Sequence, residues 1–354
     1  MFKSAPYSKL FEPPRFLEMS AVSVEITPVG IYFLTNKKTE RGLLPDKYGL
    51  VPLVPGEVVH CEVVKREPVI RALQAIKKKT GCDFARFSIP EEKTYIFKLD
   101  LPNLKPEEIH DILDFKIEEN IPLSSKEAVF DYEIVPTKGA TKTLQVVVSV
   151  APLKIVEDAI ALFTEAGLKP ILFSPESSNL ARALVHPKNE QTLVIANICE
   201  ENIILSLVVS GIVFQTSSVN FGSATINESL AKYYKVSAPE VGRMKKEKLY
   251  SDNPDSLEVF SHLINTFSAA KDEIYKFIEY CNAREDIKGD VERIILSGQD
   301  AMISGLSHYL SANLGLPVEI GNTWLNNFKF NEYVPEIGRA ESLNYAVVNG
   351  LSQI

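Results

Sequence analysis

One pattern occurs twice in the chain and limits the folds that it can adopt. Three β-like runs in close succession are followed by a helix, first near the N-terminus and again after Pro187. The six runs are Ala21–Thr27, Gly30–Asn36, Leu50–Cys61, Thr192–Asn197, Ile203–Val209 and Ile212–Val219. The helices that follow them are predicted at Pro68–Thr80 and Ser223–Tyr234. A repeat of this length indicates a duplicated α/β architecture.

Each half carries its own insertion. In the first half, residues 94–150 read strand–helix–strand–strand, because two-residue alternation surrounds a helix predicted at Pro106–Asn120. In the second half the insertion is helical, with segments at Pro239–Lys248 and Leu257–Cys281. We expect the longer helix to bury an apolar seam. Its predicted members are Leu257, Phe260, Ile264, Phe267, Ile274, Ile278 and Cys281.

This layout predicts an α/β protein with a duplicated actin-like (ribonuclease H-like) ATPase fold, the fold of actin, sugar kinases and Hsp70. The β-α-β-β insertion forms a separate subdomain in the first half. The predicted divisions are a tail at 1–18, subdomain 1A at 19–85 and 151–188, the inserted subdomain 1C at 86–150, subdomain 2A at 189–222 and 291–338, the helical subdomain 2B at 223–290, and a C-terminal helix at 339–354 that returns to 1A.

Composition excludes several classes of function. The 354 residues contain 38 Lys and Arg against 46 Asp and Glu, a net charge of −8, so nothing favours nucleic acid. The longest near-apolar stretch, Ile203–Phe214, falls short of the roughly 20 residues that a spanning helix needs. The cysteines and histidines are scattered singly, which predicts neither disulfides nor a metal site. The four cysteines are Cys61, Cys82, Cys199 and Cys281.

Two other segments have two possible roles each. Residues 1–18 combine prolines with Lys3, Lys9 and Arg15 and four aromatic residues. They are interpreted as a loosely held terminus, with an arm for a partner or membrane surface as the alternative. The aromatic residues of the loop Asn322–Arg339 are predicted to pack against the body of the protein, with a contact surface as the alternative.

The first turn of an actin-like cleft would face the phosphates of a nucleotide, which backbone N–H groups in small-residue turns hold. Here Glu25 can replace the usual metal-holding Asp, while Thr27 and Tyr32 stand where Gly and Lys are expected. Pro28 has no N–H to donate. This turn lacks the donors and the positive charge that a polyphosphate requires.

The second turn also lacks the residues that are expected to bind a nucleotide. Asn197 and Cys199 stand where Asp and Gly are expected, and Glu200 and Glu201 add negative charge. Each like-charge contact at 4 Å costs on the order of 4 kcal/mol at an effective dielectric constant of about 20. We therefore predict no conventional Mg·ATP hydrolysis, no catalytic residue and no resident metal. The chain also contains no P-loop, GxGxxG, GxSxG or HExxH motif.

Several short blocks occur in a specific order along the chain. They are Ser88–Glu91, Leu101-Pro102, Phe115–Leu123, Asp131-Tyr132, Ala166–Pro170, Asn179–Leu184, Leu296–Gly298, Gly305-Leu306 and Leu314–Val318. Together they resemble the PilM family, the actin-like proteins of type IV pilus assembly. The Ile-Pro-Leu block at 121–123 and the Gly-Leu-Lys-Pro block at 167–170 are the most specific.

The resemblance implies a cytoplasmic scaffold that a partner holds at the inner membrane of a type IV pilus or related type II secretion-like machine. In the family, the N-terminal cytoplasmic peptide of PilN, a single-pass membrane protein, docks in a groove beside the inserted subdomain, a standard mode of peptide recognition. The resemblance implies a PilN-like partner, contacts with other pilus components and the possibility of self-association.

The chain departs from the family at the nucleotide site. The adenine-side Gly-Gly reads Gly298-Gln299, and the Glu-x-Glu-Arg-x-Lys helix keeps only its first Glu with Arg243 and Lys245. We predict a vestigial nucleotide cleft for which ATP with Mg is a doubtful cofactor. Its predicted residues are Glu25, Thr27, Tyr32, Asn197, Cys199, Arg243, Lys245, Gly298 and Gln299.

Two alternatives remain at this stage. The retained Glu25, Gly298, Arg243 and Lys245 favour an ATP-binding or hydrolysing enzyme of the same fold. A membrane-tethered filament protein like FtsA is the other, but that class usually ends in a basic amphipathic helix. The stretch Asn344–Ile354 contains no Lys or Arg.

Overall fold

The structure is a computed structural model that describes residues 20–354 except 103, 105, 137–142, 251–253 and 288. The tail predicted at 1–18 lies outside the described residues.

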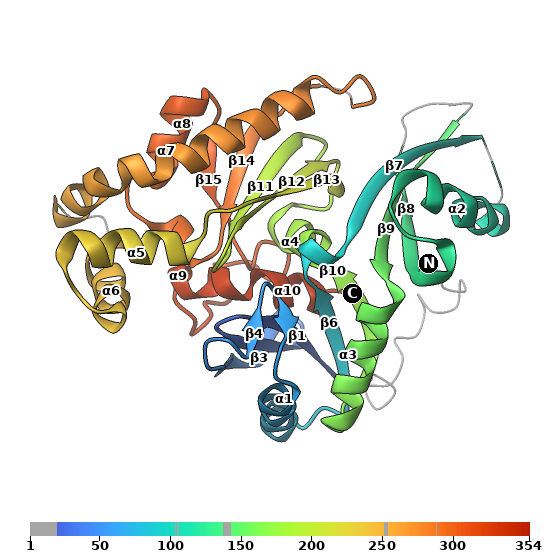
Figure 1. Cartoon of the computed structure of the whole chain (residues 1–354), viewed down its shortest axis with the longest axis horizontal. Coiled ribbons are helices and arrows are strands. Elements are labelled where there is room, and N and C mark those ends of the chain that lie inside the picture. The colour runs from blue at the N-terminus through green and yellow to red at the C-terminus, as the bar shows by residue number, and fades with distance from the viewer. Residues whose placement is uncertain (1–19, 103, 105, 137–142, 251–253, 288) are drawn as a thin grey trace.

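Two five-stranded sheets with matching topology form the two halves (Figure 1). In each sheet, an antiparallel meander is joined on one side by two parallel strands. The first sheet has the order β10-β6-β1-β2-β3, with β1 (Ala21–Thr27), β2 (Gly30–Thr39), β3 (Gly42–Pro52), β6 (Phe84–Ile89) and β10 (Lys169–Pro175). The second has the order β13-β12-β11-β14-β15, with β11 (Thr192–Ile198), β12 (Ile203–Val209), β13 (Ile212–Val219), β14 (Arg293–Ser297) and β15 (Val318–Ile320). The duplicated α/β fold is confirmed.

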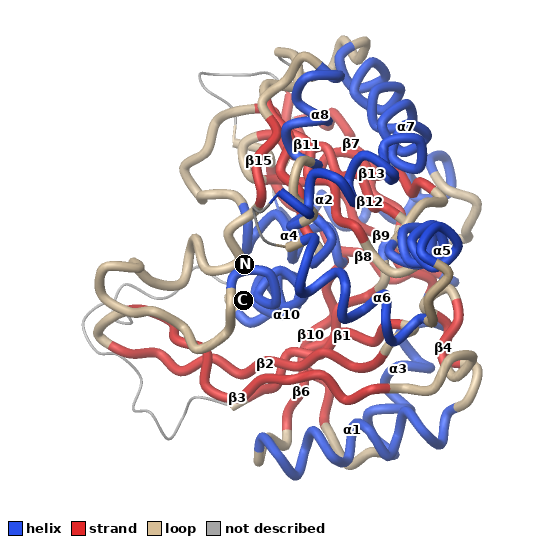
Figure 2. Tube along the Cα trace, turned by 90° about the vertical axis from the view of Figure 1, so that its left-hand side faces the viewer, coloured by secondary structure: helices blue, strands red, loops and turns tan. Residues whose placement is uncertain are grey.

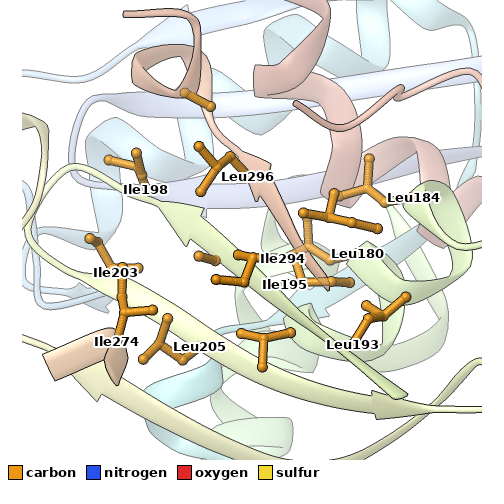
Figure 3. Packing of buried hydrophobic residues seen from close by; sticks show 14 of the residues in the cluster. Leu180, Leu184, Leu193, Ile195, Ile198, Ile203, Leu205, Ile274, Ile294 and Leu296 are labelled. Atoms are coloured by element: carbon orange, nitrogen blue, oxygen red, sulfur yellow. The ribbon is translucent and has the colours of Figure 1, made fainter. Parts of the chain in front are cut away.

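Helices cover the outer faces of the sheets and fill the space between them. In the first half these are α1 (Arg66–Thr80), α3 (Leu153–Glu165) and α4 (Glu176–Leu184). In the second half they are α5 (Ser223–Tyr234), α6 (Ala238–Met244), α7 (Pro254–Asn282) and α8 (Leu306–Leu314), followed by α9 (Arg339–Ser342) and α10 (Ala346–Ser352). Apolar side chains of α4 join those of the second sheet in the largest core (Figure 3).

The insertion in the first half is a three-stranded sheet covered by one helix. Its elements are β7 (Tyr95–Pro102), α2 (Pro106–Asn120), β8 (Ala128–Ile134) and β9 (Thr143–Pro152), with the strand order β7-β9-β8. One face packs against α2, and the other face contributes Ile96, Val135 and Val147 to the core of the second half. The subdomain therefore contacts both halves of the protein.

The predicted third strand at Leu50–Cys61 is wrong. A two-residue turn leads β2 directly into β3 at Gly42, whose carbonyl accepts a 3.0 Å hydrogen bond from the Thr39 hydroxyl. The strand ends at Pro52, and Pro55 follows; neither proline has an N–H to continue a ladder. The residues beyond form a separate short hairpin, β4 (Val58–Val59) and β5 (Glu62–Val63).

The predicted seam of the long helix is wrong at two positions. Leu257 is 61% exposed and Ile264 is 38% exposed, whereas Phe260 and Leu263 are buried. Because neighbouring helical residues point about 100° apart, burial of Leu263 turns Ile264 away from the core.

Short 3₁₀ turns interrupt the helical segments near the end of the second half. One, at Gln299–Met302, is followed by Gly305 at φ 86°, the N-cap residue of α8. The C-terminal helix predicted at 339–354 is divided into α9 and α10 by another 3₁₀ turn, at Leu343–Tyr345.

Three of the four aromatic residues of the loop at 322–339 pack as predicted, and the fourth, Phe330, is 49% exposed. Trp324 is 2% exposed and stacks on Phe328, which contacts Tyr333 edge to face. The cluster includes Leu34 of β2 and Tyr345 near the C-terminus, so the loop fastens the second half to the first.

Candidate functional site

A cavity of about 330 Å³ lies between the two halves. The carboxyl ends of β1, β6 and β10 meet on one side, and those of β11 and β14 meet on the other. Ligands of open α/β sheets bind at this kind of edge. The topology therefore makes this cavity the candidate site of the fold.

Eight of the nine predicted site residues line the cavity. They are Glu25, Thr27, Tyr32, Asn197, Cys199, Lys245, Gly298 and Gln299. The ninth, Arg243, is exposed on α6 and is not among the lining residues. Because α6 ends at Met244 and a π-type turn follows at Lys245–Leu249, Lys245 points inward while Arg243 remains in solvent.

Among the further lining residues that the sequence did not predict are Cys61, Glu91, Glu176, Tyr250 and Asp300. A signal for two of them was present in the strand pattern. Glu91 and Glu176 follow the ends of β6 and β10, two parallel strands beside β1, which itself carries Glu25. Three glutamates at the ends of three adjacent parallel strands must meet at one edge of the sheet.

Lys245 is the only Lys or Arg among the described lining residues, and it is fully engaged. Its Nζ lies 2.7 Å from Asp300 Oδ1 and donates to Asn227 Oδ1 at 2.9 Å. Tyr250 donates its hydroxyl proton to the same carboxylate at 2.6 Å. The side chains of Lys245 and Asp300 are 9% and 1% exposed. The positive charge of Lys245 is therefore paired within the protein and is not available to a ligand.

Buried carboxyl groups dominate the opposite wall. Burial raises the pKa of Glu25 well above its usual range, and nearby Glu176 raises it further. Burial, followed by the charge of Glu91, raises the pKa of Glu176 to about 7. Burial also raises the pKa of Glu91, although the Ser177 backbone N–H donates a 3.1 Å hydrogen bond to its Oε2. Glu176 therefore retains its proton over a pH range in which an exposed carboxyl would already have lost it.

Polar contacts join the two halves across the cavity. Asn197 donates to Glu176 Oε1 at 2.9 Å, and Asn202 donates to Glu92. At the rim, the His60 backbone N–H in the β4–β5 turn donates to Glu201 Oε2 at 3.1 Å. Side chains of this protein thus occupy part of the space between the halves.

Burial is the main cause of the raised pKa values of the two cavity thiols, Cys61 and Cys199, with nearby glutamates as a further cause. Both cysteines are free. A thiol with a raised pKa stays protonated and is a poor nucleophile. Among the described residues, no group of three or more His, Cys, Asp or Glu is arranged to hold a metal ion.

The raised pKa of Glu176 predicts a pH dependence of stability. A carboxyl that titrates near 4.5 when unfolded and near 7 when folded binds more protons in the folded state, so its contribution is lost as pH rises from about 4.5 to 7. We expect Glu176→Gln to reduce this decline by up to about 3 kcal/mol. Chemical denaturation across this pH range measures it, and an unchanged slope in the variant would contradict the assignment.

The duplicated sheets and the cavity between them define an actin-like protein, and comparison with solved structures agrees. A chain of a PilM–PilN type IV pilus biogenesis complex superposes with a TM-score of 0.76 at 15% identity, over 94% of this chain and 98% of that chain. MreB5 of Spiroplasma citri bound to AMPPNP superposes with a TM-score of 0.55 at 13% identity, over 96% of this chain and 95% of that chain. The ethanolamine utilization protein EutJ of Carboxydothermus hydrogenoformans superposes with a TM-score of 0.54 at 15% identity, over 97% of this chain and 90% of that chain.

The model of the type IV pilus assembly protein PilM family matches residues 23–353. The chain therefore belongs to the PilM family, and the resemblance seen in the sequence is confirmed. No curated protein matches the chain significantly. Within the described residues, none of the helices has the length and apolar character needed to cross a membrane.

Proposed function

We propose that this protein is a non-enzymatic scaffold of the type IV pilus inner-membrane assembly machinery and binds the N-terminal cytoplasmic peptide of a PilN-like membrane protein. Membership of the PilM family is the observation that carries the proposal. A solved complex of PilM with PilN has the same fold over nearly the whole chain. On this proposal the protein is cytoplasmic and reaches the membrane through its partner.

The chemistry of the cavity supports a non-enzymatic role. The residues present do not fit a nucleotide polyphosphate, because buried carboxyl groups face the space and Lys245 is held by Asp300. Pro28 contributes no N–H at the first turn. A phosphate chain would also meet Glu200 and Glu201 at the second turn.

Calorimetry tests this part of the proposal. We expect no heat of binding when Mg·ATP is titrated to millimolar concentration into the purified protein, because Asp300 holds Lys245 and no other Lys or Arg among the described lining residues can attract the phosphates. A saturable isotherm, or phosphate release above the buffer rate, would support the alternative of an ATP-using enzyme.

We place the proposed peptide at the junction of the inserted subdomain with the first half. β8 is the outer strand of its sheet and contacts α3, which packs against β10, the outer strand of the first sheet. These three elements expose Val129, Ile160 and Ile171, each about two-fifths exposed. An extended peptide can add to a free strand edge and place apolar side chains on such residues.

A binding measurement tests the partner. We expect Val129→Asp and Ile160→Asp to weaken binding of a labelled N-terminal peptide of the PilN-like protein at least about tenfold, since buried apolar anchors contribute most of the affinity of such interfaces. Leu257→Asp, a substitution at an exposed leucine of α7, is the matched control and should bind normally. No affinity of the wild-type protein for the peptide would overturn the proposal.

A further inference from the structure

The far end of the β2–β3 hairpin exposes a group of basic residues. Lys37 and Lys38 end β2 and Arg41 lies in the turn, all with exposed side chains. Within the described part of the chain, neither Lys37 nor Arg41 forms an ion pair with a carboxylate. In Figure 2 the strands of this hairpin extend to the left, away from the body of the molecule.

The loop at 322–339 adds to the same end of the sheet. Gly42 forms a bridge with Phe328, and the Leu43 N–H donates to the Asn327 carbonyl at 2.9 Å. This antiparallel pairing places Lys329 beside Arg41. The Lys329 side chain is 79% exposed, 3.8 Å from Glu332. We call Lys37, Lys38, Arg41, Lys329 and Phe330 the hairpin-end surface.

An aromatic ring is presented beside these cations. Phe330 is 49% exposed and contacts Phe328 edge to face, with their centroids 5.6 Å apart. Phe328 in turn stacks on buried Trp324, so packed aromatic side chains support the exposed ring of Phe330. Val334, further along the loop, is 74% exposed.

The net charge of this surface is opposite in sign to that of the whole chain. The whole chain carries −8, yet here four cations stand against three nearby carboxylates, Glu40, Asp46 and Glu332.

We propose that the hairpin-end surface binds the anionic phospholipid surface of a membrane. Lysine and arginine near an anionic bilayer each contribute about 1 kcal/mol through the surface potential, which is roughly fivefold in partitioning. An exposed aromatic ring at the same level can enter the headgroup region. This contact goes beyond the proposed scaffold role, and it would orient the protein independently of its partner peptide.

Vesicle co-sedimentation of the full chain tests the proposal without any partner protein. The probes are vesicles of phosphatidylcholine alone and vesicles in which roughly a third of the lipid is phosphatidylglycerol. We expect binding to the anionic vesicles only, weakening as salt rises. Lys37→Ala with Arg41→Ala should lower the partition coefficient about 25-fold, and Phe330→Ser should weaken the binding that remains at high salt.

The matched control is Lys246→Ala with Lys248→Ala, two exposed lysines in the second half. Its binding should equal that of the wild type. Absence of binding to the anionic vesicles would overturn the proposal, as would an equal loss in the control. Peptide affinity in the same samples separates this result from the proposed scaffold function, since the hairpin-end variants should bind the peptide normally.

Discussion

Replacing Lys245 by Ala should destabilise the protein by about 3–5 kcal/mol, the cost of leaving a buried charge without its partner. Asp300 is 1% exposed, and of the two side chains that hydrogen-bond its carboxylate only Tyr250 would remain. Lys246→Ala, one residue further along on the exposed side, should change stability by less than about 0.5 kcal/mol. Denaturant unfolding of the purified variants measures both values.

The same experiment decides between two roles for this lysine. If Lys245 served a nucleotide, its replacement would leave stability nearly unchanged and lower the affinity for Mg·ATP. If it serves Asp300, replacing both as Lys245→Met and Asp300→Asn should recover part of the lost stability, because no buried charge is then left alone. An unchanged unfolding midpoint in Lys245→Ala would contradict the structural role.

Gly350→Ala should destabilise the protein by at least about 3 kcal/mol, although alanine normally favours a helix. A Cβ at this position of α10 would lie 1.8 Å from the Asn179 carbonyl oxygen of α4 and 2.7 Å from its carbon. These are backbone atoms of a buried helix, so neither helix can move aside without opening the core between the sheets.

Gly338→Ala is the matched control for this glycine. A Cβ there meets nothing within 4 Å, and the residue has a φ of −61° that any amino acid adopts. Thermal unfolding should leave this variant near the wild type while Gly350→Ala melts well below it. Equal melting of the two variants would show that the α4–α10 contact tolerates expansion.

The duplicated fold could be predicted because it depends on strand and helix periodicity, which is local in sequence. The meander of the second half was predicted at nearly its observed bounds, as was β1. The prediction of the third strand of the first half failed because polar residues such as Asp46 and Lys47 lie at its exposed positions, and a polar stretch of this kind resembles a loop. Pairing with β2 determines where β3 lies, and the sequence of one strand alone does not reveal which strand it pairs with.

The positions of the cavity residues were predictable, but their environments were not. The turns that carry Thr27 and Cys199 lie where the repeat places them. The partner of Lys245 is Asp300, which lies 55 residues away, and no spacing rule connects them. Burial, which raises the pKa of Glu176 to about 7, is likewise a property of the folded chain alone.

The position of α10 affects how the protein is made. This helix is buried throughout and packs on α4, β1, β2 and β6, and Asn36 of β2 donates hydrogen bonds to Asn349 and Ser352. During synthesis the first sheet therefore emerges long before the residues that complete its core. Domains of a growing chain usually fold in order from the N-terminus. Here the first half can complete its core only after α10 has been synthesised, so the apolar face that α10 covers stays uncovered until then.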